Sequence, residues 1–379
     1  MESTPDRRPY RSNLCRGEQG QLRTSRRRPA TVHRRPRPGV LTSVAVVLLT
    51  GALVTPTLAA ASHGTVISPK SVAQIVRTDY QINNVANANL SYALQEAHEE
   101  GTALAIDNTT FRADKLSGLA TIDGAHYYPF YGTVVSSSVS KQSSYPARFA
   151  VVTKQSSGPG TPTAQRMCPG TGDALTFSKD SPKSDWRVSI EPYLPRLNAV
   201  PKFATTRDGF AAPLSVSLKH YVHTLPALYV KALNAQAVNG RATALLPASY
   251  FLHATCSELD LVNPQQESQV IRGLKLHFSA SVLAPSDLAA FATKGGGALA
   301  MFTFREQISE VPTVANDYVI WSHGATPWWS LLPTGHYSQV SWTIDQEFAV
   351  VVPPTGAKTG PRVVGSTAGV VAVVGTPVG

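Results

Sequence analysis

Residues 68–101 have the sequence SPKSVAQIVRTDYQINNVANANLSYALQEAHEEG, which decides the fold prediction for the first half of the chain. Ser68 is a favourable N-cap, and Pro69 suits the first position of a helix. Apolar residues then recur three or four positions apart, which places them along one helix face. Gly101 is a natural C-terminal stop. The pattern therefore predicts one long helix from Ser68 to Gly101.

Strand-like segments follow this helix, and stretches such as Ser156–Gly160 separate them with turn-forming residues. A segment that contains Pro192, Pro195 and Pro201 then marks a candidate domain boundary. The strands of this first half are predicted at residues 127–135, 148–153, 174–177 and 186–190.

The order of a helix followed by strands returns after this boundary. Pro213 begins a second helical pattern, which Asn239-Gly240 ends and which Pro226 is expected to kink or split. A shorter helix is predicted at Pro247–Leu259. Residues 274–279 alternate between apolar and polar, as a half-buried strand does. Further strands are predicted at residues 299–306, 318–321, 340–344 and 347–352, with a last pair at 362–364 and 370–374.

This repetition predicts both the fold class and the domain organisation. We expect an α+β fold with two similar domains, residues 62–200 and 201–379, which follow an N-terminal apolar segment. Each domain is expected to be a long helix packed on a curved antiparallel sheet in a cystatin-like layout, and the second ends in Val/Gly-rich strands. The length of the chain also favours two domains, because one core rarely serves so many residues.

The positive charge of the chain is concentrated at its N-terminus. Residues 1–39 contain eleven Arg, no Lys and three acidic residues, so they carry 11 − 3 = +8 of the formal charge of +10. The remaining basic and acidic residues give only 23 − 21 = +2. We therefore predict that residues 1–39 are a basic, disordered leader, and we expect no nucleic-acid partner for the near-neutral remainder.

An uncharged apolar segment, residues 40–61, follows the leader. An Arg-rich start, an apolar run and then small residues are typical of an export signal. Two alternatives stay open: a signal peptide cleaved near Ala59-Ala60-Ala61-Ser62, or a single transmembrane anchor, since the segment is long enough to span about 30 Å of hydrocarbon. In both cases we expect the folded part to be extracytoplasmic, either secreted or anchored to the cell membrane.

Cysteine usage agrees with export. Cys15 lies in the leader, so only Cys168 and Cys256 remain in the exported part. These two residues could form a disulfide in an oxidising compartment. The alternative is two separate thiols, with Cys256 as a small buried residue on a helix face.

Four residues have the spacing of a metal site. His220 and His223 lie three residues apart on the second long helix, and His253 and Cys256 repeat this spacing further on. Antiparallel packing of the two helices would let the four side chains bind zinc. Histidines at the edge of a helix surface are the simpler interpretation, so no metal and no other cofactor is predicted.

A pair of tryptophans, Trp328 and Trp329, lies in a segment flanked by Pro327 and Pro333. Exposed indole rings could bind a sugar or a protein partner. Alternatively, the two rings pack against the end of the sheet.

An acidic set, Glu96, Glu99, Glu100 and Asp107, lies near the end of the first helix. Paired carboxylates about 5–9 Å apart can hydrolyse glycosides. A solvated helix end is the simpler interpretation, and no catalytic residue is assigned. The standard phosphate-loop, nucleophile-elbow and zinc-protease motifs do not occur in the sequence.

Three further motifs carry a family resemblance: Asn83–Leu90, Tyr145–Val151 and Asp185–Val188. Together they resemble a family of exported actinobacterial proteins of unknown function, many of them lipoprotein-like. The resemblance covers most of residues 70–375, and it implies neither an enzymatic activity nor a catalytic residue. A lipid anchor does not follow from it, because no Cys succeeds the apolar segment at Ala59-Ala60-Ala61-Ser62.

These observations favour a non-catalytic binding or structural module of the cell envelope. Its partner would be another envelope protein or a cell-wall component, and residues 40–61 would contact the membrane if they are retained. The alternative is an exported hydrolase with an active site between the two predicted domains.

Overall fold

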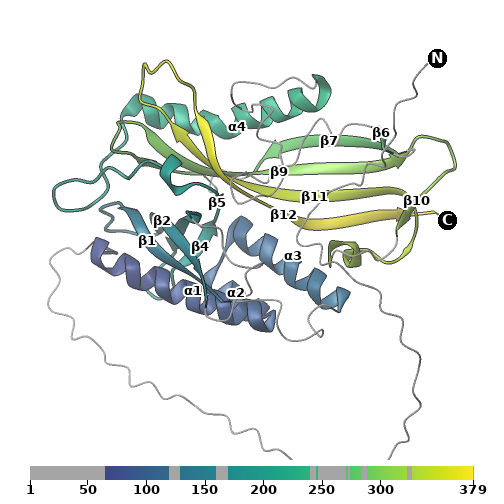
Figure 1. Ribbon diagram of the computed structural model, residues 1–379, viewed down its shortest axis with the longest axis horizontal. Helices are drawn as coiled ribbons and strands as arrows, with labels where there is room; N and C mark the ends of the chain where they lie inside the picture. The colour runs from purple at the N-terminus through teal and green to yellow at the C-terminus, as the bar shows by residue number, and fades with distance from the viewer. Residues whose placement is uncertain are drawn as a thin grey trace, which may run out of the picture. The chain divides into compact units, whose positions relative to one another are not determined.

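The computed structural model describes residues 65–118, 129–158, 170–239, 245, 270–271, 274–283, 288–321 and 327–378. The leader, the apolar segment 40–61 and the helix predicted at 247–259 lie outside these residues, as do Cys168 and Cys256. Residues 65–379 group into one compact unit, with a mixed fold of a few helices and two antiparallel sheets (Figure 1). Among the described helices, none combines the length and the apolar character that crossing a membrane requires.

The smaller sheet is built from the first half of the chain. Its strands follow the order β1-β2-β3-β4, with β5 paired to β3, and all neighbours are antiparallel. Helix α1 (Val72–Asn89) packs against β1, and its Val76 and Tyr80 share a core with Phe149 and Phe177, whose rings stack at 4.7 Å. The strands are β1 (Phe130–Val139), β2 (Ala147–Ser157), β3 (Gly172–Lys179), β4 (Arg187–Ile190) and β5 (Tyr193–Leu194).

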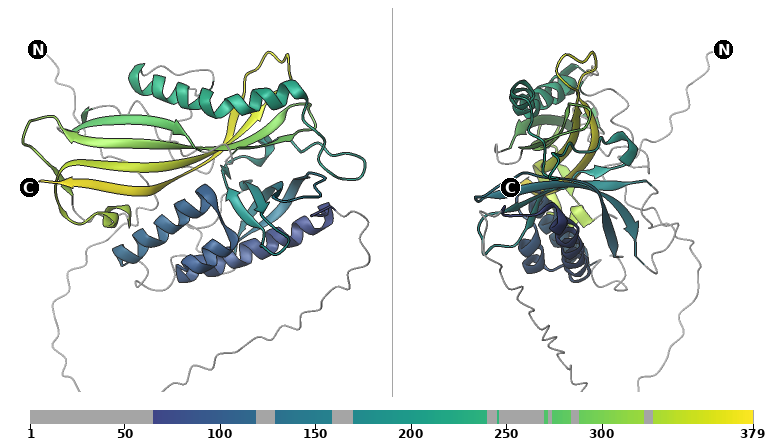
Figure 2. Two further views of the ribbon diagram at one scale, coloured as in Figure 1. Left: turned by 180° about the vertical axis from the view of Figure 1, so that it is seen from behind. Right: turned by 90° about the vertical axis from the view of Figure 1, so that its left-hand side faces the viewer.

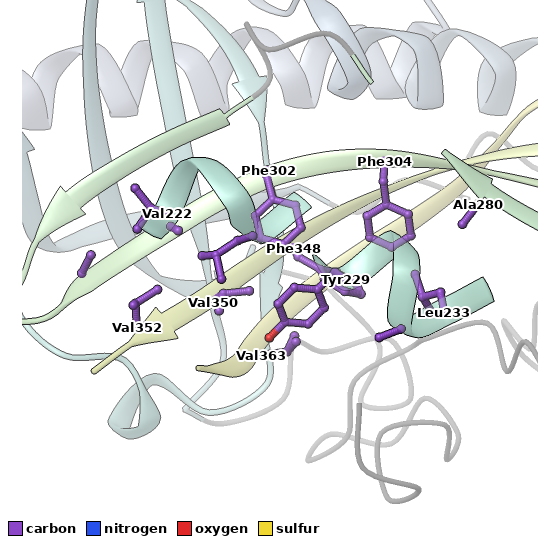
Figure 3. Packing of buried hydrophobic residues seen from close by; sticks show 14 of the residues in the cluster. Val222, Tyr229, Leu233, Ala280, Phe302, Phe304, Phe348, Val350, Val352 and Val363 are labelled. Carbon is purple, nitrogen blue, oxygen red and sulfur yellow. The ribbon is translucent and has the colours of Figure 1, made fainter. Parts of the chain in front are cut away.

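The larger sheet is built from the second half. Its order is β10-β11-β9-β7-β6, with β12 paired to β11 and β8 paired to β9. Helix α4 (Val216–Asn239) packs on β7, β8 and β9, where Tyr229 meets the rings of Phe302 and Phe348 (Figure 3). The strands are β6 (Val270–Ile271), β7 (Leu274–Val282), β8 (Leu288–Ala292), β9 (Ala298–Pro312), β10 (Val319–Trp321), β11 (Gly335–Val352) and β12 (Arg362–Pro377).

The two sheets are joined through side chains. Helix α3 (Gly101–Ser117) comes from the first half but packs mainly on β12 and on the 3-10 helix η8 (Pro327–Leu331) of the second (Figure 2). One apolar cluster takes residues from both sheets, among them Val152 and Leu194 from the smaller and Met301 from the larger. The boundary predicted near residue 200 lies after the last strand of the smaller sheet and before the first strand of the larger one. The division into two domains stays a prediction.

The single helix predicted over residues 68–101 is wrong. The segment contains η1 (Pro69–Ser71), α1 and α2 (Tyr92–His98), and Gly101 begins α3 instead of ending a helix. Leu90 ends α1 in the left-handed region at φ 46°, and Ser91 then caps α2 by accepting a hydrogen bond from the Leu94 N–H at 3.4 Å. Ser91 is therefore a second N-cap inside an apolar pattern that continues across the break.

Most of the other predicted elements are confirmed, with different bounds. The strands predicted at 340–344 and 347–352 form one strand, β11, and the last predicted pair forms one strand, β12. Helix α4 ends at Asn239 as predicted and is continuous through Pro226, where a kink or split was expected. Helix α3 and the strands β5, β6 and β8 were not predicted.

Gly172 allows β3 to approach β2 closely. A Cβ atom at Gly172 would lie 1.8 Å from the Thr153 carbonyl oxygen, so the backbone must move to accept any side chain. We expect Gly172→Ala to lower the free energy of unfolding by about 1–3 kcal/mol. Gly295→Ala is the matched control, because no atom lies within 4 Å of its Cβ position. Urea unfolding of both variants tests this, and equal midpoints would contradict it.

Candidate functional site

A cavity of about 460 Å³ lies where the end of β1, the segment 211–214, α4 and β8 meet. Its volume is in the range of small-molecule sites, about 300–1,000 Å³. Because β1 belongs to the smaller sheet and β8 to the larger, the cavity takes its lining from both halves of the chain. The apolar lining residues are Ala211, Ala212, Pro213, Leu214, Val222, Leu288, Ala290, Phe291 and Ala292.

Backbone hydrogen bonds hold the segment 211–214 in place. The Ala211 N–H donates to the Val139 carbonyl of β1 at 2.8 Å, and the Ala212 N–H donates to the Ala204 carbonyl at 2.9 Å. Ser215 then accepts a side-chain hydrogen bond from the Leu218 N–H at 3.3 Å, next to the start of α4. Small side chains on a fixed backbone leave the space that the cavity occupies.

Three basic side chains, Lys141, Lys219 and His223, contribute to the cavity lining. All three residues are exposed to solvent, so they lie at the rim. Lys141 Nζ lies 3.7 Å from the carboxylate of Asp208, which is also exposed and is not part of the lining. The described lining contains no Asp or Glu, and the cavity therefore favours negative charge.

Ser138 on β1 is one of the lining residues, but its hydroxyl is buried behind the cavity surface. The residue is 0% exposed, and its Oγ has no hydrogen-bond partner among the described residues. Buried polar groups in native proteins almost always have a partner, and a buried hydroxyl without one costs about 1–3 kcal/mol. The unpaired Ser138 hydroxyl therefore lowers the stability of the folded protein.

Removal of this hydroxyl is expected to stabilise the protein without added ligand. We expect Ser138→Ala to raise the free energy of unfolding by about 1 kcal/mol, because a buried unpaired polar group is lost. The matched control is Ser178→Ala, also in the smaller sheet, because the buried Ser178 hydroxyl donates to Glu100 and its removal should destabilise. Urea unfolding measures both, and a stability loss for Ser138→Ala would contradict the expectation.

A second group of polar residues, buried carboxylates, lies among the helices and between the two sheets. Asp79 on α1 contacts His98 Nδ1 at the end of α2, with 3.1 Å between Oδ1 and Nδ1. Gln95 on α2 donates from Nε2 to Asp107 Oδ2 on α3 at 2.7 Å. Glu99 follows His98 in the chain and is 1% exposed. The turns between α1, α2 and α3 bring these side chains together.

Burial raises the pKa of these carboxyl groups. It raises the pKa of Asp107 to about 6, against the opposing charge of His98. Burial also raises the pKa of Glu99 well above its usual value, and the charge of Asp107 adds to this effect. The pKa of Asp79 is raised by burial, although its hydrogen bond to His98 opposes the increase. The carboxylates therefore retain protons at a higher pH than exposed ones do.

The carboxylate group extends into both sheets. Asp173 Oδ2 on β3 accepts hydrogen bonds from the Tyr80 hydroxyl and from Gln155 Nε2, each at 2.7 Å. Burial raises the pKa of Asp173 to about 6. The pKa of Glu191 is raised well above its usual value, first by burial and then by the charge of Asp173. The Glu191 N–H donates to Glu347 Oε2 on β11 at 2.6 Å, which links the group to the larger sheet.

The structure brings Glu99 and Asp107, two of the four acidic residues predicted as a set, into this group. The expectation of a solvated helix end is wrong for Glu99, because its backbone bridges to Val188 of β4 and its side chain points inward. Glu96 is exposed, as expected for a solvated helix end. The sequence signal for the group was therefore incomplete, since Asp79, Asp173, Glu191 and Glu347 come from distant segments.

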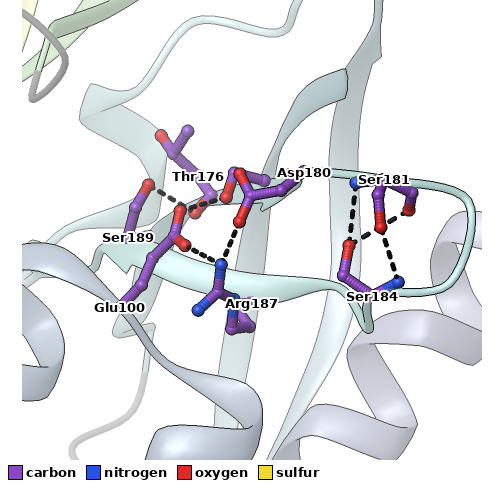
Figure 4. Close-up of polar contacts among 8 residues, drawn as sticks. Glu100, Thr176, Asp180, Ser181, Ser184, Arg187 and Ser189 are labelled. Atoms are coloured by element: carbon purple, nitrogen blue, oxygen red, sulfur yellow. Dashed lines mark hydrogen bonds and ion pairs between the residues drawn. The ribbon is translucent and has the colours of Figure 1, made fainter. Parts of the chain in front are cut away.

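Glu100 lies in a separate polar network (Figure 4). It accepts a hydrogen bond from the Ser178 hydroxyl and pairs with Arg187 Nη2 at 2.7 Å. Arg187 also pairs with Asp180 on the same side of the smaller sheet. These contacts hold the start of α3 against β3 and β4, so the role of this network is structural.

The buried carboxylates can hold protons, but the described residues show no path from them to a ligand. A second cavity of about 340 Å³, between α1 and β1, reaches Tyr80 and none of the carboxylates. Among the residues that the structure describes, no three His, Cys, Asp or Glu side chains are grouped to hold a metal ion.

The other candidate site residues are histidines, cysteines and tryptophans. His220 and His223 are exposed on α4, in agreement with surface histidines. His253, Cys168 and Cys256 lie outside the described residues, so the structure tests neither the alternative of a zinc site nor the possible Cys168–Cys256 disulfide. Trp328 and Trp329 lie half-buried in η8.

Trp329 packs against the aromatic core at the end of the larger sheet. Its ring stacks on Trp321 at 4.9 Å, and the Trp321 Nε1–H donates to the Trp329 carbonyl at 2.8 Å. These contacts favour packing as the role of this pair, and ligand binding by Trp328 and Trp329 stays a prediction.

Comparison with known proteins places the chain in a family. The model of a family described as Domain of unknown function (DUF8094) matches residues 64–375, which include both sheets, the cavity and the buried carboxylates. No curated protein and no solved structure matches the chain. Because the match covers most of the sequence, the chain belongs to the DUF8094 family, a domain of unknown function.

Proposed function

We propose that this protein is an exported, non-catalytic binding module of the cell envelope, which binds a small ligand in the cavity between β1 and α4. In this proposal the folded part is extracytoplasmic, either secreted or held at the membrane by residues 40–61. The Arg-rich leader followed by an apolar segment supports export. The resemblance to exported actinobacterial proteins supports the same location, and the near-neutral folded part argues against a nucleic-acid partner.

The cavity is the observation that carries the proposal. It has the volume of a small-molecule site, a mostly apolar lining, and a few polar groups, a combination that binding sites share. The accessible polar groups are Ser140 and the three basic side chains at the rim, Lys141, Lys219 and His223.

Binding is favoured over hydrolysis by the chemistry of the cavity lining. Hydrolysis by general acid and base needs groups within hydrogen-bond reach of the substrate, commonly carboxylates or a histidine. His223 is the only such side chain in the described lining. The buried carboxylates are the observation that favours an exported hydrolase, since raised pKa values are typical of general acids. Glu99 and His98 are 1% and 2% exposed, however, and neither lines the cavity.

The two halves of the chain have a similar arrangement of helix and sheet. Each has one long helix, α1 or α4, packed on an antiparallel sheet. We propose that they are similar domains, which meet at the cavity, and that the ligand comes from the cell envelope as a wall component or the part of an envelope protein that enters the cavity.

Site-specific photocrosslinking of the full chain in its native cells tests the binding proposal. Ser140 lines the cavity, and p-benzoylphenylalanine at this position places the reactive group at its rim. The matched control is Ser144, an exposed serine of the same β1–β2 connection that does not line the cavity. We expect a light-dependent adduct at position 140 and none at position 144, detected as a mass increase of the purified protein for a wall component or as a crosslinked species of higher mass for an envelope protein. No adduct at position 140, or the same adducts at both positions, would overturn the proposal.

A further inference from the structure

We infer that the cavity takes a single-chain amphipathic anion, with its acidic group at the basic rim and its apolar part against α4 and β8. This inference rests on the proposed function, because it names the ligand class of the same cavity. It commits to a free molecule that leaves solvent for the cavity, as opposed to a lipid surface on which the protein docks.

The rim supplies the charge complementarity. Lys219 and His223 lie one turn apart on α4, and Lys141 approaches from the segment after β1. Lys219 has no ion-pair partner among the described residues, and the Asp208 carboxylate beside Lys141 is more than half exposed. An anion at the rim therefore meets two lysines and one weakly competing carboxylate.

The interior supplies the apolar and polar contacts. Leu214 and Leu288 are half-buried and present branched side chains, and Phe291 adds an aromatic ring, so an apolar chain would leave water on entering. Ser140, a half-buried residue of the lining, can bond a polar atom of the ligand. The volume of about 460 Å³ lies in the lower part of the range for small-molecule sites, which favours one chain over two.

Two fluorescent probes of the same shape separate charge from apolar binding. The anionic probe is 1-anilinonaphthalene-8-sulfonate, and the neutral probe is N-phenyl-1-naphthylamine, which lacks the sulfonate. Titration of the full chain with each probe gives two affinities. We expect the anionic probe to bind more tightly, and we expect this preference to weaken as salt is added, because the rim charges are exposed.

A matched pair of substitutions on α4 locates the charge effect. Lys219 lines the cavity, whereas Lys231 is an exposed lysine of the same helix that does not. We expect Lys219→Glu to weaken binding of the anionic probe about two- to fivefold, as exposed charge pairs allow, and to leave the neutral probe unchanged. Lys231→Glu, which changes the net charge equally, should leave both affinities unchanged.

A third variant tests the cavity itself. Ala212 belongs to the lining, and Ala212→Trp should block both probes. If neither affinity falls in this variant, the probes do not enter the cavity and the proposed function fails. If both affinities fall but Lys219→Glu affects the two probes equally, the cavity binds ligands and only the anion inference fails.

Competition with decanoate and with lipid vesicles shows whether the ligand is a free molecule or a lipid surface. Decanoate is expected to displace the anionic probe, and decanol, its uncharged counterpart, is expected to displace it more weakly. Vesicles of phosphatidylglycerol provide the opposing outcome. Vesicle binding that is lost in Lys219→Glu, together with no displacement by decanoate, would assign the rim to a lipid surface and overturn the inference.

Discussion

The free energy of unfolding of this protein is expected to be several kcal/mol larger at pH 4.5 than at pH 7.5. Burial raises the pKa of both Asp107 and Asp173 from 3.8 to about 6. Between about pH 4 and pH 6 the folded state therefore binds more protons than the unfolded state, and stability falls as the pH rises through this window. Each of the two groups contributes about 2 kcal/mol over the measured interval, at 1.36 kcal/mol per pH unit.

Urea unfolding at a series of pH values measures this dependence. A constant m-value shows that both end states keep their compactness, so that the shift of the midpoint reports stability. Asp173→Asn removes one of the two titrating groups and should flatten the profile, with its largest stabilising effect at pH 7.5. Asp208→Asn is the control, because this carboxylate is exposed and its pKa is lowered by the Thr206 hydroxyl. Stability that rises from pH 4.5 to pH 7.5 would contradict the prediction.

The second large effect is expected in the core of the larger sheet. Phe348 is fully buried, and its ring lies 5.6 Å from Tyr229, 5.9 Å from Phe302 and 4.7 Å from Phe304, measured between ring centroids (Figure 3). Because these rings surround it on β9 and α4, the space left by Phe348→Ala cannot close easily. We expect a loss of about 3–5 kcal/mol in the free energy of unfolding.

Denaturant unfolding with two comparison variants tests this core. Phe348→Leu retains much of the apolar volume and should cost less than the alanine variant. Val216→Ala removes an apolar side chain that is 88% exposed and should change stability by no more than about 0.5 kcal/mol. Equal effects of Phe348→Ala and Val216→Ala would show that this cluster does not support the fold.

Local sequence signals predicted most of the elements. The predicted start at Pro213 and the predicted end at Asn239-Gly240 lie close to the bounds of α4, and the alternation over 274–279 matches β7. The same signals failed at the break near Leu90, since the apolar spacing continues from α1 into α2 and hides the second N-cap at Ser91. The sequence does not predict α3, because Gly101 is typical of a helix stop, whereas here its φ of 60° allows the turn into α3.

The candidate site could be predicted only in part. Glu99 and Asp107 belong to the acidic set that the sequence suggests, but Glu99 bridges to β4 and α3 packs on β4, β11 and β12, which follow much later in the chain. No local pattern marks the cavity, because Ser138 and Lys219 are ordinary residues until β1 and α4 meet. The buried carboxylates have a clearer signal in the sequence, the three consecutive polar residues Asp345-Gln346-Glu347. All three are buried inside strand β11, where polar residues are unusual.

The sequence by itself determined the basic leader, the apolar segment, and the position of most strands and of α4, since charge, apolar spacing and turn residues act over a few residues. The tertiary structure alone decided that α3 packs on the larger sheet, that both sheets share a core, and that carboxylates are buried between them. Periodicity reports which face of an element is apolar but does not name the surface that covers it. The cavity and the raised pKa values of the carboxyl groups both arise from those covering contacts. Both features therefore depend on the packing of the two halves, which the sequence pattern does not reveal.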